Sequence, residues 1–149
     1  MHGAPSKNLA SNRVFVYGTL KPGFSNYQRF CAGRMAKATP AQVQGCLYQL
    51  NLGYPGLTDG DRWIQGTLLE FEVDALLAEL DQLEGYVPQR SPDANEYTRE
   101  LIETYDIYGQ SLGSAWVYRM TPARIAHYRG RLMVGNEWPD AETEWGAPR

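Results

Sequence analysis

Short strand-like runs recur along this sequence, and they constrain its fold more than any other feature. Five of them are rich in β-branched or aromatic residues and are bounded by Gly, Pro, Asp or Asn: residues 13–17, 42–50, 63–71, 97–105 and 114–119. Only one other stretch is strongly helical. This mixture predicts an α+β fold, and a chain of 149 residues, 43% of them hydrophobic, is long enough for one core.

The fourth run alternates clearly, but neither of its two faces is plainly apolar. Residues 97–105 place Tyr97, Arg99 and Leu101 on one side and mostly polar residues on the other. Such a mixture suits a strand with one end lining a cavity, and it suits an edge strand equally well.

The strongly helical stretch is DALLAELDQLEGY, from Asp74 onward. Asp74 is a good N-cap, and Gly85 stands where a left-handed cap ends a helix. The apolar positions recur at intervals of three and four, at Leu76, Leu77, Leu80 and Leu83. Weaker helices are expected at residues 26–36, with Met35 among the inward side chains, and at residues 122–132.

Glu84 places a carboxylate within the apolar stripe of this helix. At about 100° per residue it falls next to Leu77 and Leu80, whereas Glu79 and Gln82 point away. An ionised carboxylate buried without partners is costly, so it must be paired, hydrogen-bonded, protonated or placed in a cavity. The ordinary alternative is a helix-end carboxylate that reaches solvent or caps a neighbouring loop.

A glycine ends the apolar strand VFVY, which runs directly into GTLKPG. Because glycine tolerates positive φ, the chain can turn sharply at Gly18 and leave convergent backbone N–H groups that bind an anion. An ordinary turn punctuated by Gly18, Pro22 and Gly23 is the alternative. Four of the ten tyrosines are expected near strand ends or beside the helix end: Tyr17, Tyr86, Tyr97 and Tyr118.

Charge and composition exclude several classes of function. A net charge of -3 and scattered basic residues make nucleic acid an unexpected partner. No apolar window of about 18 residues or signal-peptide core is present, so a soluble, cytoplasmic protein without membrane contact is expected. Cys31 and Cys46 lack CxxC spacing, and His2 and His127 lie at opposite ends of the sequence. We therefore expect free thiols, no metal site and no cofactor.

Five segments together resemble the γ-glutamylcyclotransferase-like family, particularly its γ-glutamylamine cyclotransferase and AIG2-like branch. They occur in the order VFVYGTLKPGFSNYQRF, LDQLEGY, EYTRELIE, AWVY and GNEW. The resemblance implies a small mixed β-barrel flanked by helices, with a cavity for a γ-glutamyl group. It covers residues 13–138, so residues 1–12 are expected to be a flexible N-terminus and residues 139–149 a polar tail.

The resemblance also implies which residues form the site. The family's Tyr-Gly-Ser/Thr-Leu loop binds substrate through backbone amides, and it corresponds to Tyr17, Gly18, Thr19 and Leu20. The family's catalytic glutamate corresponds to Glu84. Tyr97 and Tyr118 are expected to line the same cavity, and Arg99 either joins them or pairs with a surface carboxylate. The loop between Glu84 and Tyr97 departs from the family pattern and could reshape the pocket rim.

The chemistry implied is an intramolecular cyclisation. The α-amine of a small γ-glutamyl substrate attacks its own γ-carbonyl, giving 5-oxoproline and a free amine, with Glu84 as general acid and base. No enzyme nucleophile, metal or cofactor is required. The alternatives are a non-catalytic binding module for a small γ-glutamyl or carboxylate metabolite, and an enzyme that removes a γ-glutamyl protecting group from a biosynthetic intermediate.

Overall fold

The structure is a computed structural model that describes residues 13–18, 35–51, 54–71 and 75–133. Within these ranges the strands are β1 (Arg13–Val16), β2 (Met35–Gln49), β3 (Pro55–Phe71), β4 (Thr98–Tyr105), β5 (Ser111–Arg119) and β6 (Arg131–Leu132). The helices are α2 (Ala75–Leu83), the short 3₁₀-helix η2 (Pro92–Ala94) and α3 (Pro122–His127).

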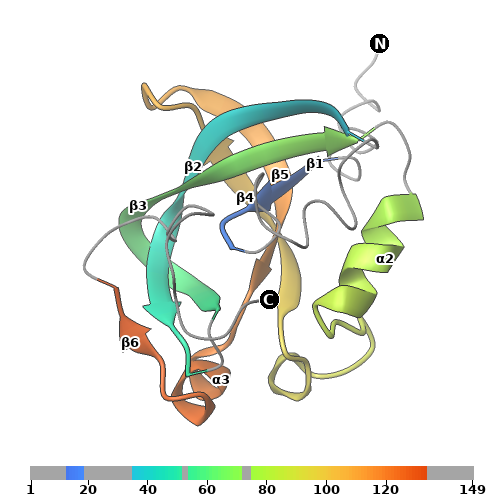
Figure 1. Ribbon diagram of the computed structural model, residues 1–149, viewed down its shortest axis with the longest axis vertical. Coiled ribbons are helices and arrows are strands. Elements are labelled where there is room, and N and C mark those ends of the chain that lie inside the picture. Colours follow the sequence, from blue (N-terminus) through green and yellow to red (C-terminus); the bar gives the residue numbers. More distant parts are fainter. Residues whose placement is uncertain (1–12, 19–34, 52–53, 72–74, 134–149) are drawn as a thin grey trace.

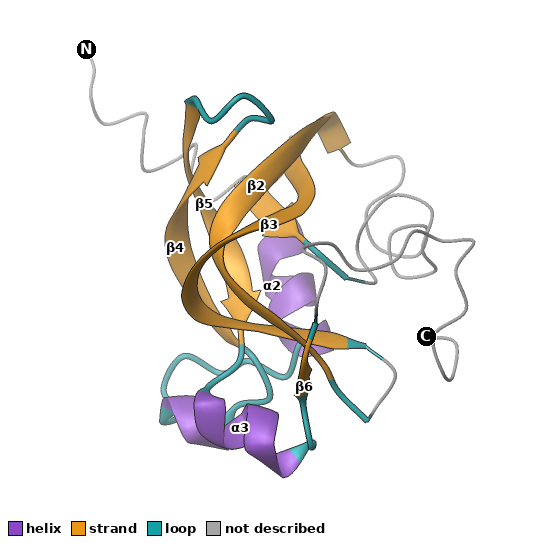
Figure 2. Ribbon diagram, turned by 90° about the vertical axis from the view of Figure 1, so that its left-hand side faces the viewer, coloured by secondary structure: helices purple, strands orange, loops and turns teal. Residues whose placement is uncertain are grey.

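The strands form a closed mixed barrel (Figure 1). They follow the order β3-β1-β5-β4-β2-β6, and a further pairing of β3 with β2 closes the ring, with β6 added beside β2. β1 and β5 run parallel, whereas the other pairs are antiparallel. Helix α2 lies against one side of the barrel and α3 lies at one end (Figures 1 and 2). The expected α+β fold with a small mixed barrel is confirmed.

Strands β2 and β3 are longer than the sequence pattern predicted. They begin at Met35 and Pro55, whereas the expected runs began at residues 42 and 63. Glycines in both strands resemble turn signals, yet Gly45 sits at a β-bulge where a Cβ atom would lie 2.7 Å from the Thr58 carbonyl oxygen. Glycine therefore permits the close approach of two bent strands here, rather than ending either of them.

The two weaker helix predictions need correction. Met35 and Ala36 belong to β2 and not to a helix, while residues 26–34 lie outside the described ranges. Helix α3 ends at His127 because the chain turns through Arg129, which has a φ of 55°. The last two residues of the expected helix form β6 instead.

Strand β4 is not an edge strand. It pairs with β5 from Thr98 to Tyr105, and Tyr105 also pairs with Gln42 of β2. Its side chains alternate between the inside and the outside of the barrel: Thr104 is fully buried, whereas Leu101 is 47% exposed.

The core contains buried apolar side chains from strands β1, β2, β3 and β5. Phe15 of β1, Leu68 of β3 and Val117 of β5 are each at most 1% exposed. Burying a side chain of this size contributes roughly 1.5–3 kcal/mol, so these contacts hold the closed barrel together. In the described part of the chain, no helix is long and apolar enough to cross a membrane.

Candidate active site

The C-terminal end of α2 is closed by a Schellman motif. The Tyr86 N–H donates to the Asp81 carbonyl oxygen at 2.9 Å, and the Gly85 N–H donates to the Gln82 carbonyl oxygen at 3.3 Å. Gly85 has a φ of 67°, the left-handed conformation that this cap requires. The predicted cap at Gly85 is confirmed. Glu84 is the residue just before it, so its backbone is fixed at the end of the helix.

The structure brings Glu84 together with three of the predicted tyrosines. Tyr17, Tyr97 and Tyr118 are all buried, and Glu84 itself is half-buried. Burial is the main reason why the pKa of each tyrosine hydroxyl lies above its usual value of 10.0, and the negative charge of Glu84 raises all three pKa values further. A charge acts on three hydroxyls in this way only when all of them lie near it. The roles of these residues stay predictions.

Each of the three hydroxyl groups donates its proton to another part of the protein. Tyr17 Oη donates to the Tyr118 carbonyl oxygen, and Tyr97 Oη donates to the Pro55 carbonyl oxygen at 2.6 Å. Tyr118 Oη donates to Asp81 Oδ1 at 2.6 Å. A tyrosine hydroxyl has one proton but can also accept hydrogen bonds. These three oxygens can therefore only accept hydrogen bonds from a ligand.

Gly18 follows Tyr17 directly, but its backbone differs from the expectation. Its φ lies outside the left-handed region, so a need for positive φ does not explain the glycine. A Cβ atom at this position would lie 3.2 Å from Cγ and 3.3 Å from Cδ of Pro55. The close approach of the Pro55 ring therefore favours a residue without a side chain. Thr19 and Leu20, the rest of the predicted loop, lie outside the described residues.

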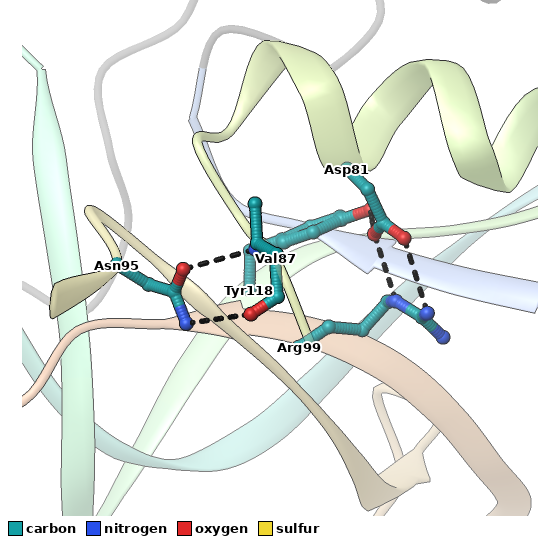
Figure 3. Close-up of polar contacts among 5 residues, drawn as sticks. All are labelled: Asp81, Val87, Asn95, Arg99 and Tyr118. Atoms are coloured by element: carbon teal, nitrogen blue, oxygen red, sulfur yellow. Dashed lines mark hydrogen bonds and ion pairs between the residues drawn. The ribbon is translucent and has the colours of Figure 1, made fainter. Parts of the chain in front are cut away.

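Asp81 is a residue of this site that the sequence pattern did not reveal. Its carboxylate receives two hydrogen bonds from Arg99, at 2.8 Å from Nε and 3.1 Å from Nη2, in addition to the one from Tyr118 (Figure 3). The side chains of Asp81 and Arg99 are only 17% and 15% exposed. Of the two alternatives for Arg99, pairing with a carboxylate is the one observed, and that carboxylate is half-buried. The spacing of Asp81 and Glu84, three residues apart on one helix, is the signal that could have pointed to it.

The loop that follows Glu84 is held by a buried asparagine. Asn95 is 2% exposed, accepts a hydrogen bond from the Val87 N–H at 2.9 Å and donates one to the Val87 carbonyl oxygen at 3.3 Å (Figure 3). Arg90 donates to Asn95 Oδ1 at 2.9 Å and to the Gly85 carbonyl oxygen at 3.1 Å. This loop is thus tied back to the helix cap beside Glu84.

The described ranges contain few residues that could bind a metal ion or act as a thiol nucleophile. No group of three or more His, Cys, Asp or Glu side chains there could hold a metal ion. Cys46 is a half-buried free thiol on β2, and His127 is exposed on α3. Cys31 and His2 lie outside the described residues.

Comparison with known proteins finds relatives that cover nearly the whole chain. A family model described as "Gamma-glutamyl cyclotransferase, AIG2-like" matches residues 14–140. The chain is 35% identical over 125 residues to a Vibrio cholerae protein named "Putative gamma-glutamylcyclotransferase", covering 84% of this chain and 93% of that protein.

Solved structures share the fold. The crystal structure of an AIG2-like protein from Mus musculus superposes with a TM-score of 0.66 at 21% identity, covering 93% of this chain and 96% of that chain. An uncharacterized protein from Pyrococcus horikoshii gives a TM-score of 0.54 at 15% identity, covering 84% of this chain and 87% of that one. At these identities the likeness concerns the architecture alone.

Proposed function

The chain belongs to the gamma-glutamyl cyclotransferase, AIG2-like family and is an enzyme of the gamma-glutamylcyclotransferase type, and from that premise we propose that it cyclises a γ-glutamyl amide. In this reaction the α-amine of the substrate attacks its own γ-carbonyl carbon. The new C–N bond closes the ring of 5-oxoproline, the original amide C–N bond breaks, and the attached group leaves as a free amine. The proton lost by the attacking amine ends on the leaving nitrogen, so the reaction is balanced without a co-reactant.

Glu84 is the group that moves this proton in our proposal. The observation that carries the proposal is the half-buried Glu84 carboxylate at the helix cap, near enough to three buried tyrosine hydroxyls for its charge to raise their pKa values. A partly desolvated carboxylate is a better acid and base near neutral pH than one in bulk water. It first accepts a proton from the α-ammonium group and delivers it to the leaving nitrogen. The second proton, which the attacking nitrogen loses after the new C–N bond forms, also ends on the leaving amine, which departs as an ammonium ion.

The tyrosine oxygens support an orientation for the substrate. Tyr17, Tyr97 and Tyr118 all donate to protein acceptors, so toward a ligand their oxygens can only accept. An α-ammonium group offers three N–H donors and suits such surroundings, whereas a carboxylate needs donors. We therefore assign the α-amino group to the side of Glu84 and the tyrosines. Backbone N–H groups of Gly18, Thr19 and Leu20 would then receive the α-carboxylate or the developing oxyanion.

A non-catalytic binding module is the alternative. The same three acceptor oxygens could hold the ammonium group of a γ-glutamyl metabolite without any reaction. Glu84 argues against a module for a small carboxylate alone, because such a site would gain nothing from a nearby negative charge. A module that binds an ammonium group would tolerate Glu84, so the formation of product decides between it and the enzyme. Removal of a γ-glutamyl protecting group from a biosynthetic intermediate would use the same chemistry with another leaving amine.

A product assay separates these possibilities. The purified protein is incubated with a panel of γ-glutamyl amides that differ in the leaving amine, and 5-oxoproline is measured by mass spectrometry. We expect 5-oxoproline and an equal amount of amine from at least one substrate, unaffected by chelators or by replacing Cys31 and Cys46 with Ser. Binding of these amides without any 5-oxoproline would support the binding module instead.

A further inference from the structure

Asp81 joins helix α2 to two strands and to the helix cap at once. Its carboxylate binds Arg99 of β4 through both oxygens and also accepts the hydroxyl proton of Tyr118 on β5. Its backbone carbonyl accepts the Tyr86 N–H at 2.9 Å. Asp81 lies in the last turn of α2, three positions before Glu84, and Figure 3 shows its side-chain contacts with Arg99 and Tyr118.

Arg99 contacts the other side of the same cap. Its guanidinium carbon lies 4.3 Å from the centre of the Trp116 ring and 5.4 Å from the centre of the Tyr86 ring. Stacking of this kind adds to the ion pair because a guanidinium group is attracted to the face of an aromatic ring. Tyr86 is thus held by Asp81 through its backbone and by Arg99 through its ring, and Glu84 lies between Asp81 and Tyr86 in the chain.

This arrangement fixes the positions of the groups it joins more than it stabilises the fold. For a half-buried ion pair, the cost of removing two charges from water offsets much of their attraction. A guanidinium group that binds both carboxylate oxygens nevertheless fixes their relative orientation closely. The Asp81–Arg99 pair therefore restricts where the end of α2 can lie on the barrel.

Asp81 also decides where the Tyr118 proton goes. The Tyr118 hydroxyl has one proton and donates it to Asp81 Oδ1 at 2.6 Å, so toward any other neighbour its oxygen can only accept. Asp81 thus fixes the Tyr118 side chain of β5 to the last turn of α2.

We propose that the Asp81–Arg99 pair is a positioning device for Glu84, which holds the end of α2, the Tyr86 ring and the Tyr118 side chain in place. The proposal rests on the proposed function for the role of Glu84. Asp81 and Arg99 act through Glu84 and need not touch the substrate.

Hydrogen exchange tests the positioning without any enzymatic assay. In Asp81→Asn and Arg99→Met, the amide of Tyr86 should exchange at least about 10-fold faster than in the wild type, because the cap opens more often. Glu70→Gln is the matched control, since Glu70 also pairs with a half-buried arginine, Arg13, at 3.6 Å. It should leave Tyr86 exchange unchanged. Unchanged exchange of this amide in both test variants would overturn the proposal.

Kinetics then test whether Asp81 acts through Glu84. Asp81→Asn should lower kcat at least about 10-fold with KM within about 3-fold, as expected for a small misplacement of a catalytic group. The same change in a Glu84→Gln background should cause no further loss, whereas a purely structural residue would lower kcat equally in both backgrounds. Equal losses would contradict the proposal. Absence of 5-oxoproline from the wild type would instead overturn the proposed function, and the exchange experiment would still decide the positioning.

Discussion

Glu84 is the residue on which the proposed reaction depends most directly. In Glu84→Gln the side chain keeps its shape but can no longer accept or deliver a proton. We expect kcat for 5-oxoproline formation to fall at least about 10²-fold, the lower range for loss of a general acid–base group. Thermal unfolding should change little, because glutamine has the size and shape of glutamate and the backbone hydrogen bonds of the cap stay in place.

Glu79→Gln is the control on the same helix. By helical periodicity Glu79 points away from the apolar stripe that contains Glu84, so its amide variant should keep full activity. Activity of Glu84→Gln within a few-fold of the wild type would remove Glu84 from the role assigned to it.

The sequence pointed to Glu84 but not to Asp81, for a physical reason. Glu84 breaks an apolar pattern within its own helix, which a local periodicity reveals. Asp81 has its partners 18 and 37 positions further along the chain, in Arg99 and Tyr118. An acidic residue on a helix looks like a solvated position until the strands that face it are known.

The cap of helix α2 is the element that fixes Glu84 in place. Gly85→Ala would put a side chain on a left-handed residue, which costs roughly 1–2 kcal/mol, with its Cβ atom 3.1 Å from Cβ of Glu96. We expect both lower stability in urea unfolding and a lower kcat, because the strain falls beside Glu84.

Gly109→Ala separates the loss of stability from the loss of kcat. Gly109 has a φ of 88° with open space around it, so alanine there meets the same backbone penalty without a clash. This variant should lose similar stability and keep its kcat. If Gly85→Ala also kept its kcat, the geometry of the cap would not matter for activity.

At the level of elements, the sequence predicted the interiors of the strands better than their ends. The runs that became β1, β4 and β5 agree with the structure to within three residues at either end. The predicted runs for β2 and β3 began too late, because Pro40 in the first missed segment and Gly56, Asp59 and Gly60 in the second resemble turn residues. The two-residue strand β6 exists through pairing with Tyr48 and Gln49, which no local pattern reveals.

At the scale of the whole molecule, barrel closure assembles the site. The parallel pairing of Phe15 with Val117 brings the end of β1 beside β5, so that Tyr17 reaches the carbonyl of Tyr118, 101 positions away. Strand propensity does not specify such pairings, and only the family resemblance anticipated that Glu84, Tyr17 and Tyr118 would meet.

The buried tyrosines also predict how the molecule responds to alkali. Burial, followed by neighbouring interactions that include the Glu84 charge, raises the pKa of Tyr17, Tyr97 and Tyr118 above 10.0, the value expected in the unfolded chain. Their contribution to stability is therefore complete below about pH 10 and is lost as pH rises, because only the unfolded state releases these protons. Each contributes a slope of about 1.4 kcal/mol per pH unit, so the three together give about 4 kcal/mol per pH unit.

Urea unfolding between pH 9 and pH 11.5 measures how steeply the free energy of unfolding falls with pH. Single variants show how much each tyrosine contributes to this slope. Tyr97→Phe should be less stable at neutral pH, because the Pro55 carbonyl oxygen loses its hydrogen bond, yet its alkaline slope should be shallower by about 1.4 kcal/mol per pH unit. Tyr108→Phe is the control, since the Tyr108 side chain is 85% exposed and its loss should leave the slope unchanged. Equal slopes in Tyr97→Phe and Tyr108→Phe would mean that Tyr97 ionises as readily in the folded protein as in the unfolded chain, contrary to its buried position beside Glu84.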